Sequence, residues 1–172
     1  MNMFKTLALP SLALALAFAS PIRAEEKPKT NADADFLTKV VPAIAASVKI
    51  LDYSAKNASD EKVRDFAERV AKQHKGSVKT ASDHAKRLKI EVAADPDNDS
   101  KEMIDKLSKL KGTELDVAFL QWLSHGHENT TVFESEVKNG NDADLKAFAK
   151  NAITSGNEHL KGARALLAKI KK

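Results

Sequence analysis

The sequence predicts an all-α fold, built as a bundle of four long helices. Apolar residues recur at spacings of three and four in four long stretches, which is typical of helices with one buried side. Each stretch has about 23 to 30 residues, so the helices match in length at roughly 35 to 45 Å. The links between them are short, long and short, and the long link contains a short helix of its own. This order predicts a crossover between the second and third long helices.

The first 24 residues have the layout of a secretory signal peptide. Lys5 precedes an apolar run from Leu7 to Phe18, and small residues follow this run. The run is too short to span a bilayer comfortably. We expect cleavage after Ala24, with Ala19 as the alternative site. The predicted organisation is therefore a signal peptide at residues 1–24, a flexible leader at 25–32 and a helical bundle domain at 33–172.

Charge and composition exclude several classes of partner. Cleavage removes Lys5 and Arg23 from the 28 basic residues and none of the 24 acidic ones, which leaves a net charge of +2. Lysines alternate with acids along the helices, so we expect no nucleic-acid partner. No segment after the signal peptide is apolar enough for a transmembrane anchor. The absence of cysteine excludes disulfides and thiolate metal sites. We therefore expect a periplasmic, or alternatively secreted, protein.

The first two long helices follow from their apolar stripes. The first covers about residues 33–56, and Pro42 is expected to kink it or to mark a late start. After a tight link, Ser59 or Asp60 is expected to cap the second helix, because short oxygen-bearing side chains accept hydrogen bonds from the first free backbone N–H groups. The second helix continues to about Leu88.

The second half of the chain contains the crossover and two further long helices. Residues 89–112 form the long link, with a short helix from Ser100 to Leu110. The third long helix is expected to start at Thr113, a capping residue that is followed three positions later by an acid, Asp116. It is expected to continue unbroken to about Lys138. The fourth covers Asp142 to about Ile170. Because the crossover contains a short helix, a simple up-down-up-down bundle also fits the sequence.

Three of the five histidines, His74, His127 and His159, fall near the middles of three different predicted helices. In the crossover arrangement they lie at nearly one depth, roughly 18 to 21 Å from one end of the bundle. Helical bundles build metal and cofactor sites from facing side chains at one depth. His125 points about 200° around the helix from His127 and is expected to face solvent. His84 is assigned no function.

Short segments accompany the three histidines in a distinctive order: Val63 to Ala67 ahead of His74, Leu115 to Glu134 around His127, and Glu158 to Ala163 around His159. Together they resemble the exported bacterial ferritin-like four-helix family of unknown function, whose members are often labelled outer-membrane or periplasmic proteins. The likeness covers about residues 34–168 and depends on the order and spacing of the segments. It implies a ferritin-like bundle and export, and it brings no established activity.

The likeness does not extend to a di-iron centre. Ferritin-like di-iron sites take a Glu from each of two helices and a Glu-x-x-His pair from each of the other two. The residues three before the histidines are Ala71, Ser124 and Gly156, and none of them is an acid. On the first helix, where members of that family commonly have an acid, this chain has Ser47 and Lys49. We therefore do not expect a di-iron oxidase or an iron-storage protein.

The remaining prediction is a mononuclear metal site formed by His74, His127 and His159, with Glu134 or Glu128 as a carboxylate candidate. Three neutral imidazoles with an open position suit a single zinc or copper ion, and a carboxylate would widen the choice to iron. The alternative interpretation is structural, because histidines among apolar neighbours are often only packed and hydrogen-bonded.

The sequence indicates no enzyme class, since it lacks a nucleophile elbow, a Gly-rich phosphate loop and a dinucleotide fingerprint. Two functions stay open. The first is an exported periplasmic bundle that binds one metal ion for sequestration or stress tolerance. The second is a structural or interaction bundle with a degenerate site, which contacts an envelope protein partner. The two functions make different predictions for the structure, because only metal binding requires the three imidazole rings to converge within ligand distance.

Overall fold

The computed structural model describes residues 31–93 and 98–170, and all regular elements in these ranges are helices. The predicted all-α bundle is confirmed. The predicted signal peptide at 1–24, and nearly all of the predicted leader at 25–32, lie outside the described residues. The helices are α1 (Ala32–Asn57), α2 (Glu61–Leu88), α3 (Asn98–Ser108), α4 (Gly112–Glu128), α5 (Thr131–Asn139) and α6 (Ala143–Ile170).

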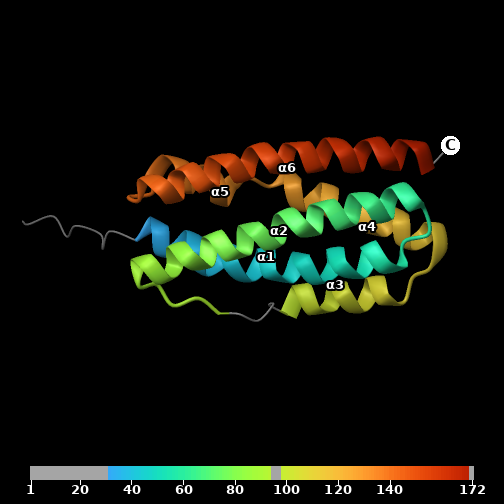
Figure 1. Cartoon of the computed structure of the whole chain (residues 1–172), viewed down its shortest axis with the longest axis horizontal. Helices are drawn as coiled ribbons and strands as arrows, with labels where there is room; N and C mark the ends of the chain where they lie inside the picture. Colours follow the sequence, from blue (N-terminus) through green and yellow to red (C-terminus); the bar gives the residue numbers. More distant parts are fainter. Residues whose placement is uncertain (1–30, 94–97, 171–172) are drawn as a thin grey trace, which may run out of the picture.

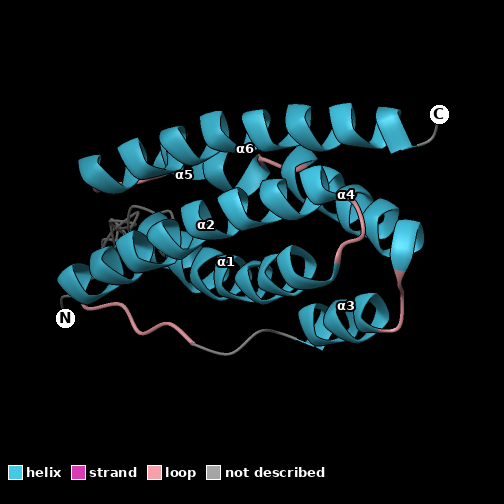
Figure 2. Cartoon of the chain, turned by 45° about the vertical axis from the view of Figure 1, so that its right-hand side comes forward, coloured by secondary structure: helices cyan, strands magenta, loops and turns pink. Residues whose placement is uncertain are grey.

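The bundle has two parts, one formed by α1 and α2 and the other by α4, α5 and α6. The helix α1 packs against α2, and α4 and α5 both pack against α6. Figure 1 shows that α4 and α5 run in the same direction as α2, whereas α6 runs in the opposite direction. The helix α3 lies in the crossover, on the outer side of α1 and away from α6 (Figures 1 and 2). The parallel course of α2 and α4 agrees with the predicted crossover.

The ends of α1 and α2 follow local capping chemistry. Asp60 caps α2, because its side chain accepts from the backbone N–H groups of Lys62 and Val63. This helix ends at Leu88, as the sequence predicts. The cap of α1 is Asn31, slightly earlier than expected. The helix continues uninterrupted through Pro42.

The third long helix is not continuous, which contradicts the prediction of one helix from Thr113 to Lys138. It is divided into α4 and α5 at Asn129 and Thr130. Both residues have side-chain oxygens that compete with helical hydrogen bonding. The Asn129 side chain accepts from the backbone N–H of Thr131, and the Thr130 hydroxyl donates to Glu134. These local bonds start a new helix instead of continuing the old one.

The predicted cap at Thr113 is also wrong. The helix α4 begins at Gly112, after Lys111, and that position has no side-chain cap. Asp116, the acid three residues on, is buried and reaches across to the start of α2 instead. Its carboxylate accepts from the backbone N–H groups of Ser59 and Asp60 and from the Ser59 hydroxyl. Asp116 therefore fixes the α1–α2 link to α4, a role that depends on tertiary structure.

The apolar core consists of two clusters that lie toward opposite ends of the long helices. One contains Leu51, Phe66 and Phe119, among others, and the other contains Phe36, Leu37 and Leu145. Ser47 on α1, His74 on α2 and His159 on α6 all lie in the stretches between the two clusters. The candidate site therefore lies at the level where the apolar core is interrupted. None of the helices in the described ranges has the length and apolarity to cross a membrane.

Candidate metal centre

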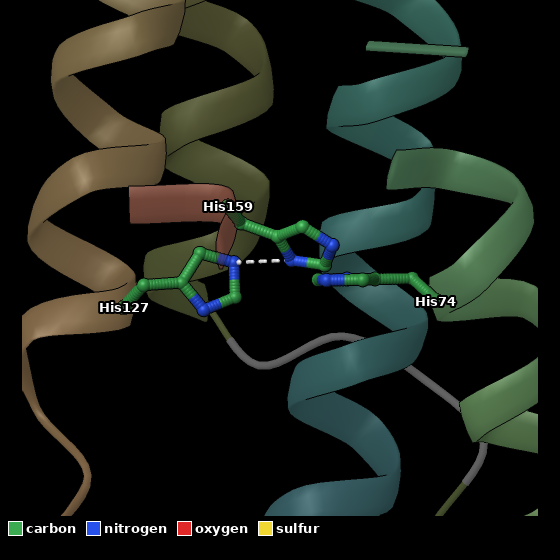
Figure 3. Close-up of side chains that lie close together, drawn as sticks. All are labelled: His74, His127 and His159. Carbon is green, nitrogen blue, oxygen red and sulfur yellow. Dashed lines mark hydrogen bonds between the residues drawn. The ribbon is translucent and has the colours of Figure 1, made fainter. Parts of the chain in front are cut away.

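His74, His127 and His159 converge in the middle of the bundle from α2, α4 and α6 (Figure 3). Each ring offers one nitrogen, and these three atoms all lie within 4.8 Å of one another. His159 is buried, and the other two residues are half-buried. The predicted meeting of the three histidines at one depth is therefore seen in the structure. We call this group the histidine trio.

The tightest pair in the histidine trio is His127 and His159. Nδ1 of His159 lies 3.3 Å from Nε2 of His127. Two imidazole nitrogens on one tetrahedral zinc ion, with bonds of about 2.0 to 2.1 Å, are separated by about 3.3 to 3.4 Å. The ring centre of His74 lies 5.6 Å from that of His127 and 5.4 Å from that of His159.

A hydroxyl group orients the ring of His74. Oγ of Ser47 lies 2.7 Å from Nδ1 of His74, and the same hydroxyl donates to the backbone carbonyl of Ile44. A ligand role for Nε2 of His74 would require the Ser47 oxygen to accept the Nδ1–H proton, with the hydroxyl proton donated to Ile44.

An amide group orients the ring of His159 in the same way. Oε1 of Gln73 lies 2.7 Å from Nε2 of His159 and can only accept, so Nε2 carries the proton. The lone pair of His159 is therefore on Nδ1, which faces His127. Metal-binding histidines characteristically donate their second ring N–H to such an oxygen, which fixes both the tautomer and the ring orientation.

All three imidazoles are held in the neutral form. Burial, followed by the charges that His127 and His159 would carry, lowers the pKa of His74 to about 3. Burial and the neighbouring His159 lower the pKa of His127 to about 4. The pKa of His159 is lowered by burial and by the positive charge of Arg69. Neutral imidazole is the form that binds a metal ion, so protons do not compete near neutral pH.

The absence of a side chain at Gly156 leaves room for His127. A Cβ atom at this position on α6 would lie 3.1 Å from Nδ1 of His127, closer than an ordinary contact. Gly156 is also the residue three before His159, where a di-iron protein would have its acid. The space that an acidic side chain would need is therefore filled by an imidazole ring.

The two predicted carboxylate candidates do not join the histidine trio. Glu128 is exposed and pairs with Arg164 on α6. Glu134 is exposed on α5, where it accepts from the Thr130 hydroxyl. Because α4 and α5 are separate helices, Glu134 does not continue the face of the helix that contains His127. His125 is exposed as expected, and its Nδ1 lies 2.8 Å from the carbonyl of Gln121. Nδ1 of His84 lies 3.0 Å from Nη2 of Arg87.

The roles of Ser47 and Gln73 could not be found by sequence reasoning alone. Ser47 was notable only because it occupies a position at which an acid was expected. Gln73 precedes His74 in the chain, yet it contacts His159 on a different helix. Its only sequence signal is the adjacency to a histidine, and the partner becomes apparent once α2 and α6 are packed together.

Comparison with known proteins places the chain among bundles of uncharacterised role. One solved structure, a DUF305 protein of Streptomyces coelicolor, superposes with a TM-score of 0.71 at 19% identity, covering 82% of this chain and 94% of that one. A DUF305 fragment of Deinococcus radiodurans gives a TM-score of 0.73 at 11% identity, covering 83% and 99%. At these identities the likeness concerns the fold. No curated protein matches the chain. The sequence profile of DUF4142, a domain of unknown function, matches residues 19–166, so the chain belongs to the DUF4142 family.

Proposed function

We propose that this protein is an exported ferritin-like helical bundle that binds one zinc or copper ion through His74, His127 and His159. The observation that carries the proposal is the orientation of the rings. One nitrogen from each of the three rings lies within 4.8 Å of the other two, while Ser47 contacts Nδ1 of His74 and Gln73 contacts Nε2 of His159. Oxygen partners of this kind are characteristic of metal-binding histidines.

The donor set favours zinc or copper over iron. Three neutral nitrogen donors with an open position match the three-histidine arrangement of zinc sites, and imidazole also suits copper. The carboxylate that would widen the choice to iron is absent from the trio, because Glu128 and Glu134 are engaged elsewhere. A di-iron centre also lacks its bridging carboxylates, since the three ligand positions are all imidazoles.

Export is supported by the sequence and by the fold relatives. Residues 1–24 have the layout of a signal peptide, and the Streptomyces coelicolor relative is described as a candidate secreted protein. In the periplasm, a small bundle with one accessible metal site would serve for sequestration or for tolerance of metal stress. No catalytic group beyond the trio is required for this role.

Metal titration of the purified mature protein tests the proposal. The wild-type protein is expected to bind one equivalent of Zn²⁺ or Cu²⁺ in calorimetry, and elemental analysis after gel filtration is expected to show one ion per chain. A triple variant with His74→Ala, His127→Ala and His159→Ala should bind none. The matched control replaces the two other histidines, His84→Ala with His125→Ala, and should bind like the wild type. Equal binding by all three proteins would refute the proposal.

A further inference from the structure

A cavity of about 680 Å³ lies beside the histidine trio and is lined by residues of α1, α2, α4, α5 and α6. Ser47, His74 and His127 are among its lining residues, and so is Gly156. The third ring of the trio, His159, is not part of the lining. The cavity therefore reaches the trio from the side of His74 and His127, and a ligand in it could approach an ion held by the trio.

The walls of the cavity are mostly apolar. Ile44 from α1, Trp122 and Leu123 from α4, Phe133 from α5 and Ile153 from α6 all contribute to them. The break between α4 and α5 lies at the same place, since Asn129 and Thr130 also line the cavity. A volume of this size is within the range of small-molecule sites, which are largely apolar with a few polar groups that fix the ligand.

The charges around the cavity favour an anionic ligand. The lining contains one lysine, the exposed Lys39, and it contains no aspartate or glutamate. Three neutral imidazoles would leave a bound divalent ion with its full charge of two. A buried charge without a partner is costly, and an anion in the open position would offset it.

We propose that the cavity binds an apolar monocarboxylic acid. Its carboxylate would take the open position of the metal ion held by the trio, and its hydrocarbon part would lie along the apolar walls of the cavity. This proposal rests on the proposed metal-binding function. It adds to that function a class of ligand, small acids with one carboxylate and an unbranched or aromatic body, which the trio alone would not define.

Titration of metal-loaded protein with three matched probes tests this proposal. The probes are octanoate, acetate and octanol, which supply the whole ligand, the head group alone and the chain alone. Protein loaded with Co²⁺ as a spectroscopic substitute for Zn²⁺ should bind octanoate at least about tenfold more tightly than either partial probe, since each buried methylene adds to affinity. Octanoate should also change the visible absorption bands of Co²⁺, because its carboxylate enters the coordination sphere.

The outcomes separate the two proposals. If the protein fails to bind Co²⁺ or Zn²⁺, the metal-binding function itself is wrong, and the ligand proposal falls with it. If the metal binds but octanoate binds no better than acetate, only the ligand proposal is overturned. The same conclusion follows if octanoate binds equally well to metal-free protein, because its head group would then not be held by the metal.

Variants of the lining provide a second check. Ala43→Trp places a large side chain at the cavity wall on α1 and should weaken octanoate binding at least tenfold, with unchanged affinity for Co²⁺. Ala147→Trp, at an exposed position outside the lining, is the control and should have no effect. Equal effects of Ala43→Trp and Ala147→Trp would contradict the assignment of the cavity.

Discussion

Oγ of Ser47 lies 2.7 Å from Nδ1 of His74, across the contact between α1 and α2. This hydrogen bond places a polar group of the first helix directly behind a ring of the trio. The same hydroxyl lies 2.7 Å from the backbone carbonyl of Ile44. The helix α1 thus contributes to the candidate site by orienting a ligand, although it supplies no ligand of its own to the trio.

Ser47→Ala should reduce metal affinity by about 10- to 100-fold, the range found when an oxygen partner of a metal-binding histidine is removed. The fold should be retained, because the substitution removes one hydroxyl at a half-buried position. Competition titration with a zinc chelator measures the change. Ser82→Ala, at a half-buried position on α2, is the control, and equal affinities of the two variants would contradict the role of Ser47.

Gly156→Ala should weaken metal binding without loss of helicity. The added Cβ would lie 3.1 Å from Nδ1 of His127, so that ring must move away from its present position. Alanine is also a better helix former than glycine by about 1 kcal/mol, which should maintain or raise the stability of α6. Gly76→Ala is the matched control, because no atom lies within 4 Å of its added Cβ. Chelator competition and circular dichroism measure the two effects, and unchanged affinity in Gly156→Ala would argue against the placement of His127.

The metal-free protein should lose stability as the pH falls below about 6.5. Burial lowers the pKa values of His74 to about 3 and of His127 to about 4, whereas both are near 6.5 in the unfolded chain. Between these values the unfolded state binds protons that the folded state does not, so the stability contributed above pH 6.5 is lost toward pH 4. Urea denaturation should show a slope of about 1.4 kcal/mol per pH unit for each ring that binds a proton only in the unfolded state.

The variant that checks this pH dependence is His74→Leu. It removes one of the titrating rings, so its free energy of unfolding should change less between pH 6.5 and pH 4 than that of the wild type. His125→Leu, which replaces an exposed histidine, should retain the wild-type slope. A wild-type slope in His74→Leu would mean that the buried ring does not cause the acid sensitivity.

Glu136 should have the opposite dependence on pH. Glu136 on α5 is 1% exposed, and neither of its carboxyl oxygens has a hydrogen-bond partner among the residues that the structure describes. Burial and the nearby Asp33 carboxylate raise its pKa from 4.5 to about 7. The stability that this group contributes is fully present below pH 4.5 and is lost as the pH rises through 7. Glu136→Gln should therefore stabilise the protein at pH 8 by about 1 to 3 kcal/mol.

The comparison for Glu136→Gln is made by urea denaturation at two pH values. At pH 4.5 the carboxyl group is protonated in the folded state, so the amide should have little advantage. Ser135→Ala, a neighbouring exposed substitution, controls for general effects on α5. If Glu136→Gln stabilised the protein equally at pH 4.5 and pH 8, ionisation of Glu136 would not be the cause.

Asp116→Ala should destabilise the bundle by about 2 to 4 kcal/mol, because it removes the acceptor of three hydrogen bonds and leaves backbone N–H groups without partners. Glu114→Ala, an exposed change on the same helix, is the control. Both are measured by urea denaturation at pH 7. A loss below about 0.5 kcal/mol would show that the Asp116 contacts contribute little to the link between α4 and α2.

The sequence was sufficient for those features that depend on local chemistry. The cap at Asp60 and the end of α2 at Leu88 follow from side-chain capping and apolar periodicity. The common depth of the three histidines also followed, because the number of residues along straight helices of known rise gives the depth, whereas the convergence of the rings was left open. These predictions required no knowledge of which side chains touch across the core.

Features that depend on packing could not be predicted in the same way. Asp116 has the spacing of a local capping box, yet its carboxylate binds the start of α2, which is 56 and 57 residues away in the chain. The helix is interrupted at Asn129 and Thr130 because side-chain hydrogen bonds there compete with helical hydrogen bonds, although the apolar spacing continues past this point. For the same reason Glu134, which a continuous helix would place in line with His127, is exposed on α5.

X-ray absorption spectroscopy at the zinc edge, on mature protein loaded with one equivalent of Zn²⁺, tests the central claim most directly. The histidine trio predicts three nitrogen ligands at about 2.0 to 2.1 Å with the outer-shell scattering of imidazole rings. The signal should disappear in the variant that lacks His74, His127 and His159. A spectrum dominated by oxygen ligands without imidazole scattering, or one that is unchanged in the triple variant, would contradict a metal site at the trio.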